Sequence, residues 1–153
     1  MLFGRILLPT DFGMGYEEAL AKLEKMKVQA DEVVLLHVID DGMLKSFMRE
    51  HETSSTARAE EILRDMVERK LWVEAARASR IFKTDDVRTI VTFGSPEREI
   101  VEVAEREDVS VVVMPSRGDV FTSHSPGSTT IKVISLSQTP VLVVGVGHGR
   151  DES

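Results

Sequence analysis

Ser110-Val-Val-Val-Met114 runs into Pro115-Ser-Arg-Gly-Asp-Val-Phe-Thr-Ser-His-Ser-Pro-Gly-Ser-Thr-Thr130, which is followed by Ile131-Lys-Val-Ile-Ser-Leu-Ser137. The first segment is an apolar, β-branched run typical of a buried strand, and the third has a helical pattern. The loop between them contains two glycines and several hydroxyl side chains. Such a strand, loop and helix often form a phosphate site, because the loop and the helix N-terminus direct backbone N–H groups toward the ligand. The stretch therefore predicts an α/β fold with a candidate phosphate site after one of its strands.

The rest of the chain repeats this alternation of strand and helix patterns. Strands are predicted at residues 5–8, 32–39, 87–93, 109–114 and 140–146, and helices at 17–26, 57–78, from 96 onward and at 128–137. Apolar strands alternating with helices are typical of a parallel sheet covered on both faces. The expected fold class is α/β, with a single open, doubly wound, five-stranded parallel sheet in which the first strand lies beside the fourth. We expect one domain over residues 1–146 and a polar tail at 147–153.

Several side chains have predicted places in this fold. The apolar face of the helix at 57–78 is predicted to contain Ile62, Leu63, Met66, Val67 and Leu71, and that of the helix after Pro96 to contain Ile100, Val101 and Ala104. Trp72 is interpreted as a packing residue, and His37 as buried within its strand. The charged run from Arg58 to Glu61 is interpreted as a solvated face. Residues 40–56 are less regular and are expected to form a flap or a short helix packed loosely on the body.

Composition limits the classes of function. The 153 residues carry a net charge of −7, which argues against a non-specific nucleic-acid binder, since such proteins need a basic face. The absence of cysteine excludes disulfides and thiolate metal sites, and the four histidines are far apart in the sequence, so no metal site is expected. No apolar run approaches the length of a membrane span, and the N-terminal run does not resemble a signal peptide. We therefore expect a cytoplasmic protein without membrane or nucleic-acid partners.

Two loops are predicted to meet at one crevice. In open doubly wound sheets, ligands bind at the carboxyl ends of the strands where the strand order reverses. The loop after the first strand, Pro9-Thr-Asp-Phe-Gly-Met-Gly15, would face the loop after the fourth. Asp11 could then accept hydrogen bonds from an adenine amino group or a ribose hydroxyl, while Gly118, Gly127 and Ser128 could approach phosphates. The alternative interpretation of each residue is structural: Asp11 as a cap of the first helix or of the loop, Ser128 as a helix N-cap, and Gly118 as a turn glycine.

Taken together, these segments resemble the universal stress protein family over nearly the whole chain. The resemblance lies in Pro9-Thr-Asp11, Leu36-His-Val38, Val111–Met114 with Ser116-Arg-Gly118, and Gly127-Ser128 followed by Thr139-Pro-Val-Leu-Val-Val144. It implies adenine near Asp11 and the backbone of Val38, ribose near Pro9 and Met114, and phosphates on Gly118, Gly127, Ser128 and Thr129. The full set of candidate binding residues is Pro9, Thr10, Asp11, Val38, Met114, Pro115, Arg117, Gly118, Gly127, Ser128 and Thr129.

The loop after the fourth strand departs from the pattern of ATP-binding family members. That pattern is Gly, two residues, Gly, nine residues, then Gly and Ser or Thr; here Pro115 replaces the first glycine and eight residues separate Gly118 from Gly127. Proline removes one N–H donor. If that donor contacts the ligand, its loss costs about 1.5–3 kcal/mol, or about ten- to hundred-fold in affinity. Arg117 could offset part of this by pairing with a phosphate, with a solvated arginine as the alternative. We expect AMP to bind at least as readily as ATP, with Mg²⁺ involved only with ATP.

The last strand and the lack of catalytic groups complete the functional expectation. Val141–Val146 is apolar and uncharged, and an unprotected edge strand of this kind favours self-pairing across a two-fold axis. The family commonly dimerises through this strand, so a homodimer is expected. No nucleophile–base pair is apparent, and we predict a nucleotide-binding sensor or regulator rather than an enzyme. Two alternatives stay open: a non-nucleotide member that acts on another protein through its dimer and residues 40–56, and a slow nucleotide hydrolase that depends on Asp11.

Overall fold

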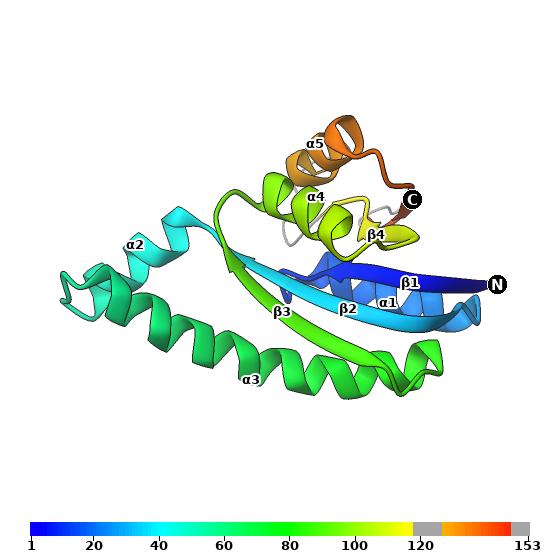
Figure 1. The fold of residues 1–153 in the computed structure, drawn as a ribbon, viewed down its shortest axis with the longest axis horizontal. Coiled ribbons are helices and arrows are strands. Elements are labelled where there is room, and N and C mark those ends of the chain that lie inside the picture. The colour runs from blue at the N-terminus through cyan, green and yellow to red at the C-terminus, as the bar shows by residue number, and fades with distance from the viewer. Residues whose placement is uncertain (118–126, 148–153) are drawn as a thin grey trace.

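Five parallel strands form one sheet in the order β3-β2-β1-β4-β5 (Figure 1). The computed structural model describes residues 1–117 and 127–147. The strands are β1 (Leu2–Pro9), β2 (Gln29–Ile39), β3 (Val87–Phe93), β4 (Val111–Pro115) and β5 (Val141–Val144). This order confirms the predicted α/β class and the placement of β1 beside β4. Gly118, the rest of 118–126, and 148–153 of the predicted tail lie outside the described residues.

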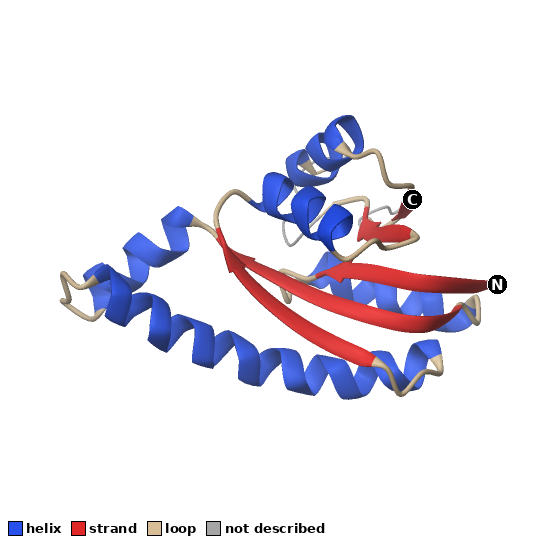
Figure 2. Ribbon diagram, in the orientation of Figure 1, coloured by secondary structure: helices blue, strands red, loops and turns tan. Residues whose placement is uncertain are grey.

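Helices cover both faces of the sheet (Figure 2). They are α1 (Met14–Lys25), α2 (Asp41–Glu50), α3 (Thr56–Phe82), α4 (Pro96–Arg106) and α5 (Ser128–Leu136). Side chains alternate across a strand, so Val33 and Leu35 of β2 join the apolar cluster beneath α1 and α3, while Val34 and Leu36 join the cluster beneath α4 and α5. Within the described ranges, no helix combines the length and apolar character needed to cross a membrane.

The long helix α3 corrects two side-chain predictions. Leu63, Val67 and Leu71 are buried as expected, but Met66 is exposed and Trp72 has 73% of its surface exposed. Met66 and Trp72 each neighbour a buried residue in sequence, and one residue rotates a side chain by about 100° around a helix. Both therefore point toward solvent, and the interpretation of Trp72 as a packing residue is wrong.

Two other segments differ in detail from their predictions. On α4, Ile100 and Ala104 are buried as expected, but Val103 is fully buried whereas Val101 is only half-buried, so the inward face is rotated slightly from the predicted one. Residues 41–50 form a regular helix, α2, whose N-cap Asp40 accepts a hydrogen bond from the N–H of Met43 at 2.8 Å. Leu44 and Phe47 are buried in the main apolar cluster, so α2 is not loosely packed as predicted.

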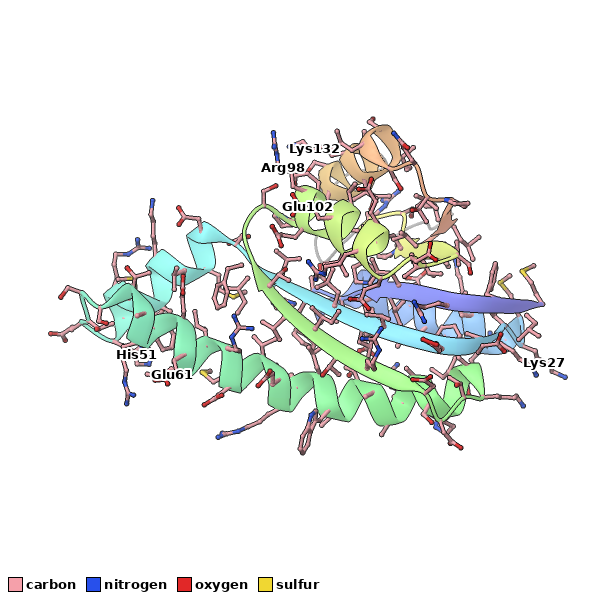
Figure 3. All side chains as sticks on the ribbon, viewed as in Figure 1. Lys27, His51, Glu61, Arg98, Glu102 and Lys132 are labelled. Atoms are coloured by element: carbon pink, nitrogen blue, oxygen red, sulfur yellow. The ribbon has the colours of Figure 1, made fainter. Side chains whose placement is uncertain are left out.

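Charged side chains project from the outer surface. Figure 3 shows Lys27, Glu61, Arg98 and Lys132 pointing away from the body. Glu61 forms an ion pair with Arg58 at 3.1 Å in which both side chains are largely exposed, which confirms the interpretation of that run as a solvated face. Such exposed pairs contribute little to stability.

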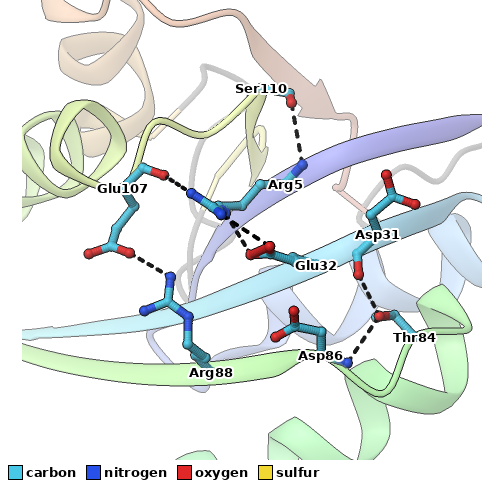
Figure 4. A network of polar contacts seen from close by, with 8 residues as sticks. All are labelled: Arg5, Asp31, Glu32, Thr84, Asp86, Arg88, Glu107 and Ser110. Atoms are coloured by element: carbon cyan, nitrogen blue, oxygen red, sulfur yellow. Dashed lines mark hydrogen bonds and ion pairs between the residues drawn. The ribbon is translucent and has the colours of Figure 1, made fainter.

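A network of polar contacts lies at the amino ends of the strands (Figure 4). Arg5 of β1 donates to both carboxylate oxygens of Glu32 on β2, at 2.6 and 3.0 Å, and also to the carbonyl of Glu107. The hydrogen bond from Arg5 lowers the pKa of Glu32. Thr84 donates to the carbonyl of Asp31 at 2.7 Å. The network joins β1 and β2 to the turns before β3 and β4, and leaves the carboxyl ends of the strands to the loops.

Candidate functional site

The turn after β1 is held by its own side chains. The N–H of Phe12 donates to Thr10 Oγ1 at 2.9 Å, and the N–H of Gly13 donates to Asp11 Oδ1 at 2.8 Å. Gly13 is the N-cap of α1 and no side-chain hydrogen bond caps that helix, so one oxygen of Asp11 caps the loop and the helix-cap alternative is wrong. The Asp11 side chain is nevertheless exposed, and its carboxylate has a second oxygen. Phe12 adopts a φ of 61°, in the left-handed region that non-glycine residues rarely occupy.

This turn is attached to β2 at two points. The N–H of Thr10 donates to the carbonyl of Leu36 at 2.8 Å, and Nδ1 of His37 lies 2.7 Å from the carbonyl oxygen of Thr10. The ring centres of Phe12 and His37 are 4.8 Å apart, and Nζ of Lys70 on α3 lies 5.3 Å from the centre of the Phe12 ring. His37 is only 5% exposed, which confirms the prediction that it is buried.

The second loop starts and ends at one place. The N–H of Gly127 donates to the carbonyl of Ser116 at 2.8 Å, and Thr130 Oγ1 donates to the carbonyl of Pro115 at 3.0 Å. These bonds hold the N-terminus of α5 beside the end of β4. Gly127 is the N-cap of α5 and Ser128 is its first residue, so the alternative interpretation of Ser128 as the N-cap is wrong. Because the N–H of Gly127 already has an acceptor, Gly127 would serve a phosphate by close approach rather than as a donor.

The C-terminal segment closes over the same region. Ser116 donates its N–H to the carbonyl of Val144 at 2.8 Å and accepts the N–H of Val146 at its Oγ, at 2.9 Å. A Cβ added at Gly147, which has a φ of +139°, would lie 3.3 Å from Cζ of Arg117. Arg117 is therefore half-buried against the backbone rather than a solvated arginine. The bridging role of Ser116 escaped the sequence-based reasoning, because nothing near it in sequence identifies Val146 as its partner.

The two loops lie at the same edge of the sheet. β1 and β4 are parallel neighbours, with Ile6 opposite Val111 and Leu7 opposite Val112, so both strands end on one side. The described candidate residues differ in exposure: Pro9, Thr10 and Met114 are buried, Val38, Pro115, Arg117, Gly127 and Thr129 are half-buried, and Asp11 and Ser128 are exposed. Val38 and Met114 both contact the apolar cluster beneath α4 and α5, the face on which the N-terminus of α5 lies. The arrangement combines an apolar floor, a carboxylate and the first N–H groups of a helix, which have no acceptor within the helix.

Burial of His37 predicts a dependence of stability on pH. Burial lowers the pKa of His37 below its ordinary value of 6.5, against the opposing effects of the Thr10 carbonyl and of Asp11. The unfolded chain therefore binds a proton at a higher pH than the folded chain does, so stability should decrease as the pH falls from about 6.5 toward the folded pKa. The measurement is the free energy of urea unfolding between pH 8 and pH 5.

The matched variants are His37→Asn and His51→Asn. His51 is exposed, and its Nδ1 also lies near a backbone carbonyl, that of Phe47, at 3.0 Å. The free energy of unfolding should depend less on pH in His37→Asn, and should keep the wild-type dependence in His51→Asn. An unchanged slope in His37→Asn would show that another group causes the dependence.

A model of the universal stress protein family matches residues 2–145. The chain belongs to the universal stress protein family. Universal stress protein MJ0577 of Methanocaldococcus jannaschii is 34% identical over 155 residues, covering 94% of this chain and 96% of that protein. The solved structure of MJ0577 covers 100% of both chains with 33% identity and a TM-score of 0.78. The crystal structure of the hypothetical protein PH0823 covers 99% of both chains with 39% identity and a TM-score of 0.83.

Some structural neighbours in the universal stress protein family are complexes with nucleotides. One was solved with cAMP, at 17% identity and a TM-score of 0.57, over 94% of this chain and 97% of that chain. Another, from Archaeoglobus fulgidus, was solved with dAMP, at 19% identity and a TM-score of 0.54, over 94% of this chain and 98% of that chain. At these identities the likeness concerns the fold alone. Together with the family match, the neighbours confirm the resemblance noted in the sequence.

Proposed function

We propose that this universal stress protein binds an adenine nucleotide between the turn after β1 and the N-terminus of α5, and acts as a sensor or regulator. The observation that carries the proposal is the hydrogen bond from Gly127 to the Ser116 carbonyl at 2.8 Å, which holds the N-terminus of α5 beside the end of β4. A helix N-terminus favours an anion, since its first N–H groups and the helix dipole both face the ligand. The cAMP and dAMP of two family neighbours support adenine nucleotides as the ligand class.

Each part of the nucleotide has a proposed contact. The second carboxylate oxygen of Asp11 and the backbone of Val38 would bind adenine, and Pro9 and Met114 would contact the ribose. Phosphates would lie at the first turn of α5, against Ser128 and Thr129, with Gly118 and Arg117 nearby in sequence from the other end of the loop. Thr10 positions Asp11, because its hydroxyl accepts the N–H of Phe12.

Pro115 bears on how many phosphates the site accepts. It lies in β4, its carbonyl accepts the hydroxyl of Thr130, and as a proline it offers no N–H. The phosphate region thus has one donor fewer than in the ATP-binding pattern. We propose that AMP binds at least as tightly as ATP, and that Mg²⁺ enters only with the phosphates of ATP. No group of three His, Cys, Asp or Glu side chains suited to a metal ion occurs among residues 1–117 and 127–147.

Calorimetric titration with AMP and ATP tests this function. We expect heat from AMP at concentrations up to about a millimolar, where the interaction is about 4 kcal/mol or stronger. Asp11→Ala should weaken binding about tenfold through loss of hydrogen bonds to a charged group. Pro115→Gly should raise the affinity for ATP more than the affinity for AMP.

Asp31→Ala is the matched control, since Asp31 is exposed at the opposite end of the sheet and contributes only its backbone carbonyl to Thr84. It should bind as the wild-type protein does. No heat with any adenine nucleotide would contradict the proposal and favour the non-nucleotide alternative.

We further propose that the protein is a cytoplasmic homodimer paired through β5. β5 is an edge strand, with β4 as its only neighbour in the described sheet. It is uncharged, and Val143 is 37% exposed in the single chain. The helix that precedes β5, α5, adds exposed apolar surface through Ile131, Ile134 and Leu136. An apolar edge of this kind favours pairing with a second copy.

A further inference from the structure

We propose that His37 is a positioning residue for the nucleotide site: in its neutral form, with the hydrogen on Nδ1, it holds the Thr10–Gly13 turn in the shape that presents Asp11 to the ligand. The effect on binding rests on the proposed function. The effect on the turn itself does not depend on any ligand.

The contact with Thr10 fixes the tautomer of His37. A backbone carbonyl only accepts hydrogen bonds, so Nδ1, 2.7 Å from the Thr10 oxygen, must carry the hydrogen. In the neutral ring Nε2 then carries only a lone pair. Nε2 is buried and has no hydrogen-bond partner among the described residues. A second proton on Nε2 would create a buried N–H without an acceptor, which is costly.

Thr10 is held by β2 through both of its backbone groups. Its N–H bonds to the Leu36 carbonyl at 2.8 Å, and its carbonyl bonds to the His37 side chain. The first bond continues the pairing of β1 with β2, in which Pro9 lies opposite Leu36. The second is made by a side chain, so it depends on the identity of residue 37. Loss of this side chain would leave one point of attachment and an unsatisfied carbonyl.

The His37 ring also supports the strained part of the turn. Phe12 has a left-handed backbone, which is strained for a non-glycine residue and persists only when surrounding contacts hold it. The ring of His37 lies against that of Phe12, with centres 4.8 Å apart and planes inclined by 33°. Phe12 is adjacent to Asp11, and its N–H and that of Gly13 close the turn. His37 therefore contacts the turn on both sides of Asp11.

The charges around His37 determine how acid affects the turn. Asp11 from the turn and Asp40 at the end of β2 favour a charged imidazole, whereas Lys70 from α3 and burial disfavour it, and burial is the largest influence. A proton added to Nε2 would be a buried N–H without an acceptor among the described residues, so acid should favour conformations in which the ring reaches water and holds Thr10 less firmly. As His37 becomes protonated, the affinity for the nucleotide should fall, and the amides of the turn should become less protected from hydrogen exchange.

The experiment combines a spectroscopic test on the wild-type protein with two variants. ¹⁵N-histidine NMR at pH 7.5 should show His37 as the neutral Nδ1–H tautomer. His37→Leu, which removes the donor, should speed hydrogen exchange of the Phe12 and Gly13 amides and weaken AMP binding, each by about tenfold. His37→Asn, which places an amide N–H near the position of Nδ1, should recover most of the protection from hydrogen exchange and most of the affinity for AMP.

His51→Leu is the matched control. His51 has the same kind of contact with a carbonyl and stacks on Phe47 with ring centres 4.0 Å apart, but it lies at the end of α2 (Figure 3). The His51→Leu substitution should change neither the hydrogen exchange of the Phe12 and Gly13 amides nor the binding of AMP. An Nε2–H tautomer for His37, or unchanged turn exchange in a folded His37→Leu protein, would overturn the inference. Absence of AMP binding in the wild-type protein, with His37-dependent protection of the turn, would instead overturn the proposed function alone.

Discussion

Val143→Lys is expected to give monomers at concentrations where the wild-type protein is a dimer. Val143 lies in the middle of the edge strand β5, opposite Met114 of β4, and is partly exposed in the single chain. Pairing across a two-fold axis places each substitution in the interface twice. Because 37% of the Val143 surface is exposed in the single chain, each copy would lose about a third of the burial energy of a valine, about 0.5–1 kcal/mol. Over two copies this loss alone should weaken association on the order of tenfold. Two lysine charges near the axis would add repulsion.

Sedimentation velocity measures this effect, and Val73→Lys provides the control. Val73 lies on α3 and is more exposed than Val143, so the same chemical change is made away from β5. Val73→Lys should sediment as the wild-type protein does. A Val143→Lys protein that remains dimeric would place the interface on another surface. Circular dichroism of both variants establishes that the fold is retained.

Leu71→Ala is expected to destabilise the protein by about 2–5 kcal/mol, whereas Trp72→Ala should change stability by no more than about 0.5 kcal/mol. Leu71 is fully buried in the cluster between α3 and the sheet, and Trp72 is mostly exposed. Truncation of Leu71 removes apolar contacts and leaves a cavity, and truncation of Trp72 leaves none. The larger aromatic residue is thus predicted to contribute less than its aliphatic neighbour.

Urea unfolding of the two variants gives the comparison directly. For a domain of this length, the Leu71→Ala change corresponds to a decrease in Tm of roughly 5–15 °C. Because both residues lie in the same helix, their effects on helix propensity are similar in size and small. A large loss of stability in Trp72→Ala would mean that its ring is covered, either by a second copy of the chain or by residues outside the described part.

The order of the strands could be predicted from the sequence, because apolar runs and connecting helices leave few topologies for a five-stranded parallel sheet. The ends of elements were less accurate. β1 begins at Leu2 rather than residue 5, and α3 continues to Phe82 rather than ending at residue 78. Gly4 near the start of β1, and Ser79 and Arg80 near the end of α3, interrupt the local patterns. Pairing with a neighbouring strand or packing on a sheet outweighs such local preferences.

For the candidate site, the sequence predicts the location but not the hydrogen bonds that form it. Convergence of the loops after β1 and β4 follows from topology, but its hydrogen bonds depend on register. Pro9 lies opposite Leu36, and this single alignment places Thr10 within reach of His37. A shift of one residue would turn His37 to the other face of the sheet. The contact between Ser116 and Gly127 likewise joins residues whose spacing in the sequence gives no indication that they meet.

The bond between Ser116 and Gly127 has a consequence for how such proteins diversify. Because the two residues hold each other, the number of residues between them does not set the position of either β4 or α5, and closing a slightly longer or shorter loop changes the entropy little. Evolution can therefore exchange this segment without rebuilding the scaffold. The same property makes it the natural point at which to graft a new recognition sequence onto this chain.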